Sequence, residues 1–126
     1  MLKLWLSVTA ISGLLAVGLG AFAAHGLKGK ISDTLLSAFQ TATHYQMFHT
    51  LALLALLVLI SQLTEVPRLL WFGVYAWLIG VVLFSGSLYW LALGGPAWLG
   101  PVTPLGGFLL LLGWFALAVG VWGLSL

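Results

Sequence analysis

The chain has 126 residues, of which 63% are apolar and only 5% are charged, too few to cover a water-facing surface; an average soluble domain is about 25% charged. Four basic residues and a net charge of +2 exclude a nucleic-acid binder, which needs many Lys and Arg contacts to phosphate. The lack of cysteine excludes disulfides, thiol catalysis and Cys-ligated metal sites. The composition is that of a membrane protein.

The charged residues divide the chain into apolar stretches. Residues 4–27, 34–64 and 69–126 contain no Asp, Glu, Lys or Arg. A membrane-spanning helix needs about 20 apolar residues, so the first two stretches hold one span each and the third is long enough for two. The sequence therefore predicts an all-α fold, a single domain over residues 1–126 that forms an integral membrane bundle of four transmembrane helices.

The first predicted span covers about residues 4–25 and follows Lys3. It ends near Ala21-Phe22-Ala23, which resembles a signal-peptidase site, but its apolar run is longer than the core of a signal peptide, so we expect a retained helix. Small residues recur at every fourth position. They are Ser12, Ala16, Gly20 and Ala24.

The second predicted span covers about residues 39–61 and belongs to a helix that begins earlier. Ser32 or Asp33 can cap this helix, because a side-chain oxygen there accepts unpaired amide protons. One helix from Asp33 to Ser61 would be about 43 Å long, more than a hydrocarbon core of about 30 Å requires. It therefore either tilts strongly or places its first two turns outside the core.

The third and fourth predicted spans cover about residues 68–92 and 104–124. Segment 94–107, rich in Gly and Pro, separates them, because these residues end one helix and begin another. Glycines recur seven residues apart in both spans, at Gly73 and Gly80 and at Gly106, Gly113 and Gly120. Small residues let helix backbones approach closely in lipid, so these faces can serve packing within one bundle or contacts in an oligomer.

A few polar side chains lie in or near the predicted spans, where they are costly unless paired. Four antiparallel spans bring the end of the first, the start of the second and the end of the third to the membrane face opposite the termini. We therefore predict that seven polar residues converge in one leaflet and form one connected hydrogen-bond network, and we treat them as a hypothetical binding site. They are His25, Tyr45, Gln46, His49, Ser85, Ser87 and Tyr89.

Several kinds of chemistry compete for these residues. His44 and His49 would lie about 140° apart around a helix, which is poor for chelation, and no carboxylate in the spans supports a metal, a haem or a proton relay. Ser85 or Ser87 near His49 lacks the acidic partner of a catalytic triad. A buried histidine in a hydrogen-bond network and a site for a lipid or small molecule stay open. We predict no catalytic residue, metal or cofactor.

Four ordered segments carry a resemblance to a known family. They are Gly20–Leu27, Thr41–His49, Phe84–Tyr89, and Thr103–Gly107 with Gly113-Trp114. Together they resemble the YgdD-like family, small bacterial inner-membrane proteins of unknown function with vertebrate transmembrane relatives. The resemblance covers nearly the whole chain and implies four spans in the bacterial plasma membrane, but no activity, substrate or cofactor. The seven candidate residues match the family pattern, whereas His44 is not a fixed part of it.

These observations predict a non-enzymatic multi-pass membrane protein with a polar pocket in one leaflet. It would serve in a structural assembly or bind a lipid or small apolar molecule. The expected partners are membrane lipid and a second copy or another membrane protein, and not nucleic acid. The alternative is a small transporter or channel component, against which the scarcity of polar residues in the leaflet near the termini argues.

The charge distribution leaves the orientation nearly tied. Lys3, Arg68 and the amino group lie on one side, and Lys28 and Lys30 lie on the other. The resemblance favours both termini in the cytoplasm, since relatives tend to carry basic residues at the terminal side.

Overall fold

The computed structural model describes all 126 residues and contains four long helices and no strands. All four are long and apolar enough to cross a membrane, which confirms the predicted all-α fold. The helices are α1 (Leu2–Phe22), α2 (Asp33–Ser61), α3 (Arg68–Ala92) and α4 (Val102–Gly120). Short helical turns accompany them, a π-helical turn at Ala23–Leu27 and 3-10 turns at Ala97–Leu99 and Val121–Gly123.

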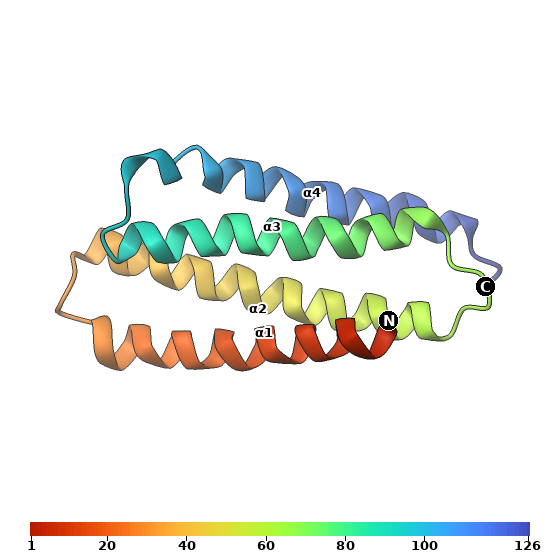
Figure 1. Cartoon of the computed structure of the whole chain (residues 1–126), viewed down its shortest axis with the longest axis horizontal. Helices are drawn as coiled ribbons and strands as arrows, with labels where there is room; N and C mark the ends of the chain where they lie inside the picture. Colours follow the sequence, from red (N-terminus) through yellow and green to blue (C-terminus); the bar gives the residue numbers. More distant parts are fainter.

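The four helices run antiparallel in chain order (Figure 1). The two termini and the α2–α3 connection lie at one end of the molecule, on the right of Figure 1, and we call this the terminal end. The α1–α2 and α3–α4 connections lie at the opposite end, which we call the loop end. α3 packs against both α2 and α4, whereas α1 packs mainly on α2.

The helix ends follow local chemistry. α2 is one continuous helix, and its cap is Ser32 rather than Asp33, because the Ser32 hydroxyl accepts a hydrogen bond from the amide of Leu35 at 3.2 Å. α4 begins at Val102, before the start at 104 that the sequence predicts, and so takes Pro104 into its first turn. Proline is tolerated there because the amide groups of the first turn have no helical partner.

Every Lys, Arg, Asp and Glu side chain is exposed and lies at a helix end or in a connection. Lys3, Glu65 and Arg68 belong to the terminal end, and the other three belong to the loop end. Those three are Lys28, Lys30 and Asp33. The long middle section of the bundle therefore carries none of the four strongly charged residue types.

α3 and α4 pack through glycines that recur every seven residues. Each of three α4 glycines faces an α3 residue from a matching series, and a Cβ added at any of them would overlap that residue. The pairs are Gly106 with Phe84, Gly113 with Trp77 and Gly120 with Leu70. Trp77 is fully buried in this seam and donates a hydrogen bond from Nε1 to the carbonyl oxygen of Leu110 at 3.1 Å. A seven-residue repeat is the spacing of left-handed helix crossings.

The small residues of α1 form a packing face only in part. Ser12 hydrogen-bonds to α2 and Ala16 is buried, but a Cβ at Gly20 would meet no atom within 4 Å and Ala24 is exposed. Much of the α1 surface therefore faces the surroundings of the bundle rather than its interior.

Candidate functional site

The seven candidate residues do not form one network. Their hydrogen bonds divide them among separate helix interfaces, and His25 stands outside all of these. The reason is the rotation of α2: Gln46 lies about 100° around the helix from Tyr45, so neighbouring residues face different helices.

The first group joins α1, α2 and α3, and we call it the Gln46 cluster (Ser12, Gln46, Thr50 and Tyr89). Gln46 Nε2 donates to the carbonyl oxygen of Ser12 at 2.9 Å and to its Oγ at 3.3 Å, and Gln46 Oε1 accepts from the Tyr89 hydroxyl at 2.7 Å. The Thr50 hydroxyl donates to the carbonyl oxygen of Gln46 at 2.6 Å. Thr50 has then used its only proton, so Ser12 is the donor in the 2.8 Å contact between the two hydroxyls.

His49 lies at a second interface, between α2 and α4. Its Nδ1 is 2.8 Å from the carbonyl oxygen of Tyr45, and its Nε2 is 3.0 Å from Nε1 of Trp114. A carbonyl oxygen only accepts and an indole N–H only donates, so His49 is neutral with its proton on Nδ1. Both ring nitrogens are occupied by protein partners and neither is free to ligate a metal ion. The chain also brings no three His, Asp or Glu side chains together in a metal-binding arrangement.

Ser85 and Ser87 make hydrogen bonds that are separate from the Gln46 cluster and from His49. Ser85 is buried and donates to the carbonyl oxygen of Ala42 at 2.8 Å, which links α3 to α2. Ser87 donates to the carbonyl oxygen of Phe84 at 3.0 Å and accepts from the hydroxyl of Thr103 at 2.6 Å, which links α3 to α4. Neither serine is hydrogen-bonded to His49, so the two residue types do not form a nucleophile–base pair.

His25 is exposed and makes no side-chain hydrogen bond. It lies in the π-helical turn Ala23–Leu27, in which Ala23 and Leu27 are buried against α2 and α3. His25 falls between these two on the other side of the turn. Its predicted place in the network is therefore wrong.

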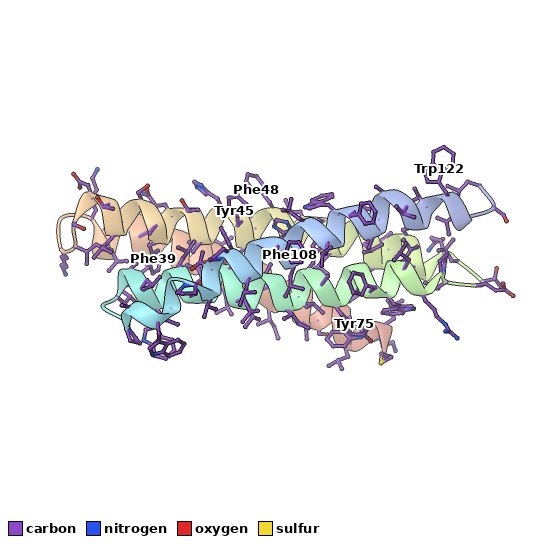
Figure 2. All side chains as sticks on the ribbon, turned by 90° about the horizontal axis from the view of Figure 1, so that it is seen from above. Phe39, Tyr45, Phe48, Tyr75, Phe108 and Trp122 are labelled. Carbon is purple, nitrogen blue, oxygen red and sulfur yellow. The ribbon has the colours of Figure 1, made fainter.

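Tyr45 and His49 line a hollow between α2 and α4, which we call the α2–α4 recess. Its volume is about 530 Å³, and it is walled by Phe84, Gly107 and Phe108 together with Leu111 and Trp114. His49 is buried at its floor, while Tyr45 and Phe108, labelled in Figure 2, are exposed at its rim. The Tyr45 ring stacks on His49 with ring centroids 6.1 Å apart. Its hydroxyl makes no hydrogen bond within the chain.

A second hollow, the α1–α3 groove, lies on a different face of α2. Its volume is about 330 Å³, and Ser12, Gln46, Ser85 and Tyr89 contribute polar groups to it. The remaining lining is apolar and includes Val8, Ile11, Leu15, Val81, Val82 and Gly86. Five of the seven candidate residues thus border two separate hollows, and His25 and Ser87 border neither of these.

Sequence reasoning missed three partners that complete these interfaces, namely Ser12, Thr50 and Trp114. A signal existed for Thr50, because it follows Gln46 by four residues and so lies on the same helix face. Trp114 belongs to a segment that carries the family resemblance, but nothing in the sequence pairs this aromatic residue of an apolar helix with His49.

Comparison with known proteins places the chain among membrane proteins. Residues 19–107 match the family model described as a protein of unknown function, DUF423. The chain is 46% identical over 120 residues to a UPF0382 membrane protein of Staphylococcus epidermidis, covering 94% of both chains. It is 42% identical over 120 residues to the UPF0382 membrane protein YwdK of Bacillus subtilis, covering 94% of this chain and 95% of the relative. A UPF0382 membrane protein of Haemophilus influenzae is 45% identical over 116 residues, covering 92% and 91%. No solved structure matches the chain.

Proposed function

The chain belongs to the DUF423 or UPF0382 family of membrane proteins of unknown function, and we propose that it binds a small, largely apolar molecule from the bilayer in the α2–α4 recess and is not an enzyme. In this proposal the recess takes the place of the predicted polar pocket, with Tyr45 and His49 as its polar residues and α4 as its other wall.

The observation that carries this proposal is the unpaired hydroxyl of Tyr45 beside an aromatic hollow. An unpaired hydroxyl is costly in hydrocarbon, and the side-chain nitrogens of His49 and Trp114, which line the same recess, are already bonded to protein. A molecule with one polar group and an apolar body would satisfy Tyr45 and fill the recess. The volume of about 530 Å³ lies within the usual range of small-molecule sites, about 300–1,000 Å³.

The alternative, a transporter or channel component, has less support. Nearer the terminal end than His49 and Thr50, the buried polar side chain is Thr9, and its hydroxyl donates to the carbonyl oxygen of Trp5 in its own helix at 2.8 Å. A solute that crosses from the loop end would therefore meet an apolar section between these polar groups and the terminal end.

We also propose a location in the bacterial plasma membrane with both termini in the cytoplasm, as the resemblance to YgdD-like proteins implies. Membrane lipid is the proposed source of the ligand. A second copy or another membrane protein is a further possible partner for the exposed helix faces.

The proposal predicts that filling the recess expels the ligand. A Cβ at Gly107 would meet the Phe84 ring at 3.6 Å, an ordinary contact, and Gly107 lines the recess, so we expect the side chain of Gly107→Leu to occupy it. We expect native mass spectrometry of the purified wild type to detect a bound small molecule. Gly107→Leu should retain it at least about tenfold less, which corresponds to about 1.4 kcal/mol of binding free energy.

Two further variants sharpen this test. Gly86→Leu is the matched control, because Gly86 lines the α1–α3 groove and a Cβ there would meet no atom within 4 Å; it should leave retention of the recess ligand unchanged. Tyr45→Phe keeps the ring and removes the hydroxyl, so it should weaken retention by about three- to tenfold. Equal retention by wild type and Gly107→Leu would overturn the proposal.

A further inference from the structure

We infer that the α1–α3 groove is a second, independent binding site, and that it takes a lipid presenting an uncharged hydroxyl group as hydrogen-bond donor. The inference does not rest on the α2–α4 recess, because the two hollows lie on different faces of α2 and have no lining residue in common.

The groove opens toward the bilayer. α1 and α3 each pack on α2 more than on one another. The surface of α2 between them is therefore not covered by either helix. Gln46 and Ser85 are almost fully buried at the bottom, whereas Ile11 and Val82 are 57% and 69% exposed at the sides. Gly86 keeps the groove open, because a Cβ there would meet no atom within 4 Å. Since both flanking helices are long and apolar enough to span a membrane, the small molecules that can enter from the side are lipids.

The hydrogen bonds at the bottom of the groove consume every donor. Tyr89 donates to Gln46, Ser85 donates to the carbonyl oxygen of Ala42, and the amide group of Gln46 donates to Ser12. The proton of the Ser12 hydroxyl is used on Thr50. No side-chain hydrogen is left for a ligand.

The same groups keep acceptor capacity. A hydroxyl that donates its proton still has oxygen lone pairs, so the oxygens of Tyr89 and Ser85 can each accept a further hydrogen bond. A lipid ester or keto group, which only accepts, finds no partner here. A hydroxyl does, and it can donate to the groove without disturbing any bond already made.

The surroundings select an uncharged amphiphile. The groove contains no Asp or Glu, so an ammonium group would lie unpaired in a medium where charge is costly. Ser85 is about 10 Å below the loop end of α3, from a rise of about 1.5 Å per residue. The polar part of the groove therefore lies near that membrane surface, and the apolar part along Val8 and Ile11 lies deeper. A lipid with its hydroxyl toward the surface and its tail toward the bilayer centre matches this order.

The test uses two photoactivatable probes, a long-chain primary alcohol that carries a diazirine and the methyl ether of the same alcohol. The full-length protein is reconstituted in phosphatidylcholine vesicles, whose lipid has no hydrogen-bond donor, and the labelled residues are mapped by mass spectrometry. We expect the alcohol to label residues of the groove about three- to tenfold more than the ether, the ratio expected for one hydrogen bond. Gly86→Leu should reduce this labelling by about tenfold, and Gly107→Leu should leave it unchanged.

Equal labelling by the alcohol and the ether would overturn the inference. So would groove cross-links between two copies of the chain that exclude the alcohol, since the occupant would then be protein. If Gly86→Leu fails to fold, judged by near-ultraviolet circular dichroism of its tryptophans, Val82→Trp at the exposed side of the groove replaces it. Loss of ligand from the recess in Gly107→Leu tests the proposed function and has no bearing on this result.

Discussion

The side-chain amide of Gln46 contacts two neighbouring helices at once, through its nitrogen to Ser12 of α1 and its oxygen to Tyr89 of α3. The partners also fix its orientation, because the Ser12 carbonyl oxygen can face only the amide nitrogen. One residue of α2 thus joins three helices. His49, on the neighbouring stripe of the same helix, joins α2 to α4 through a single bond to Trp114.

The contribution of the hydrogen bond between Gln46 and Tyr89 to stability can be measured by a double-mutant cycle with Gln46→Leu and Tyr89→Phe. Interhelical hydrogen bonds in membrane proteins contribute about 0.6 kcal/mol on average and about 1.7 kcal/mol at most. We expect a coupling free energy in this range, measured from free energies of unfolding in mixed detergent micelles. Ser61→Ala combined with Tyr89→Phe is the control and should be additive, because the exposed Ser61 hydroxyl donates within its own helix. A coupling of zero would show that the Gln46 bond contributes nothing to stability.

At the scale of helices, the α3–α4 pair and α1 differ in how tightly they pack. In the α3–α4 seam the glycines of α4 leave room for large side chains of α3, which pack directly against the α4 backbone. α1 instead buries Thr9 and Ala16, and its polar contacts with α2 centre on Ser12. Figure 2 shows Phe48 and Trp122 directed away from the bundle, and they are 61% and 88% exposed. Tyr75 of α3 instead packs edge-on against Trp5 of α1, with ring centroids 5.6 Å apart.

The glycine seam predicts that one added methyl group lowers the stability of the protein at one position of α4 and not at another. Gly113→Ala places a Cβ into the indole of the fully buried Trp77, so we expect a loss of about 1–3 kcal/mol in the free energy of unfolding, the usual cost of overpacking. Gly107→Ala lies on the same helix but meets the Phe84 ring at 3.6 Å, and it should lose no stability. Equal stability of the two variants would contradict the packing described for the seam.

The number of helices and the glycine seam could be predicted from the sequence, because both depend on local patterns. Charge-free stretches mark the spans, and a seven-residue recurrence of glycine marks a face whichever helix it meets. The partners of the polar residues could not be predicted in this way. Spacing places Tyr45 with His49 and Gln46 with Thr50, but which neighbour each stripe meets depends on the rotation of α2 in the bundle. The π-helical turn that carries His25 has no sequence signal of its own.

At the scale of the whole molecule, the two ends carry similar positive charge. Lys3 and Arg68 lie at the terminal end with the amino group, against Lys28 and Lys30 at the loop end. Positive residues tend to stay in the cytoplasm, and this balance gives the terminal end only a small advantage. The orientation is therefore open to direct measurement.

We expect the C-terminus in the cytoplasm. A green fluorescent protein fused after Leu126 should be fluorescent, and alkaline phosphatase at the same position should be inactive, since it requires the periplasm. The control places the same two reporters after truncation in the loop-end connection near Gly95, where the results should be reversed. Phosphatase activity at the C-terminus would show that the opposite orientation holds.

The confinement of all strongly charged side chains to the two ends also determines how the bundle responds to voltage. Moving one elementary charge through the membrane potential is worth about 2.3 kcal/mol per 100 mV. Rearrangements of the middle of the helices displace no Lys, Arg, Asp or Glu through that field, and His49 there is neutral. Ligand binding in the middle of the bundle should therefore not depend on the membrane potential. Occupancy of the proposed sites would then follow the lipid composition of the bilayer in both resting and respiring cells.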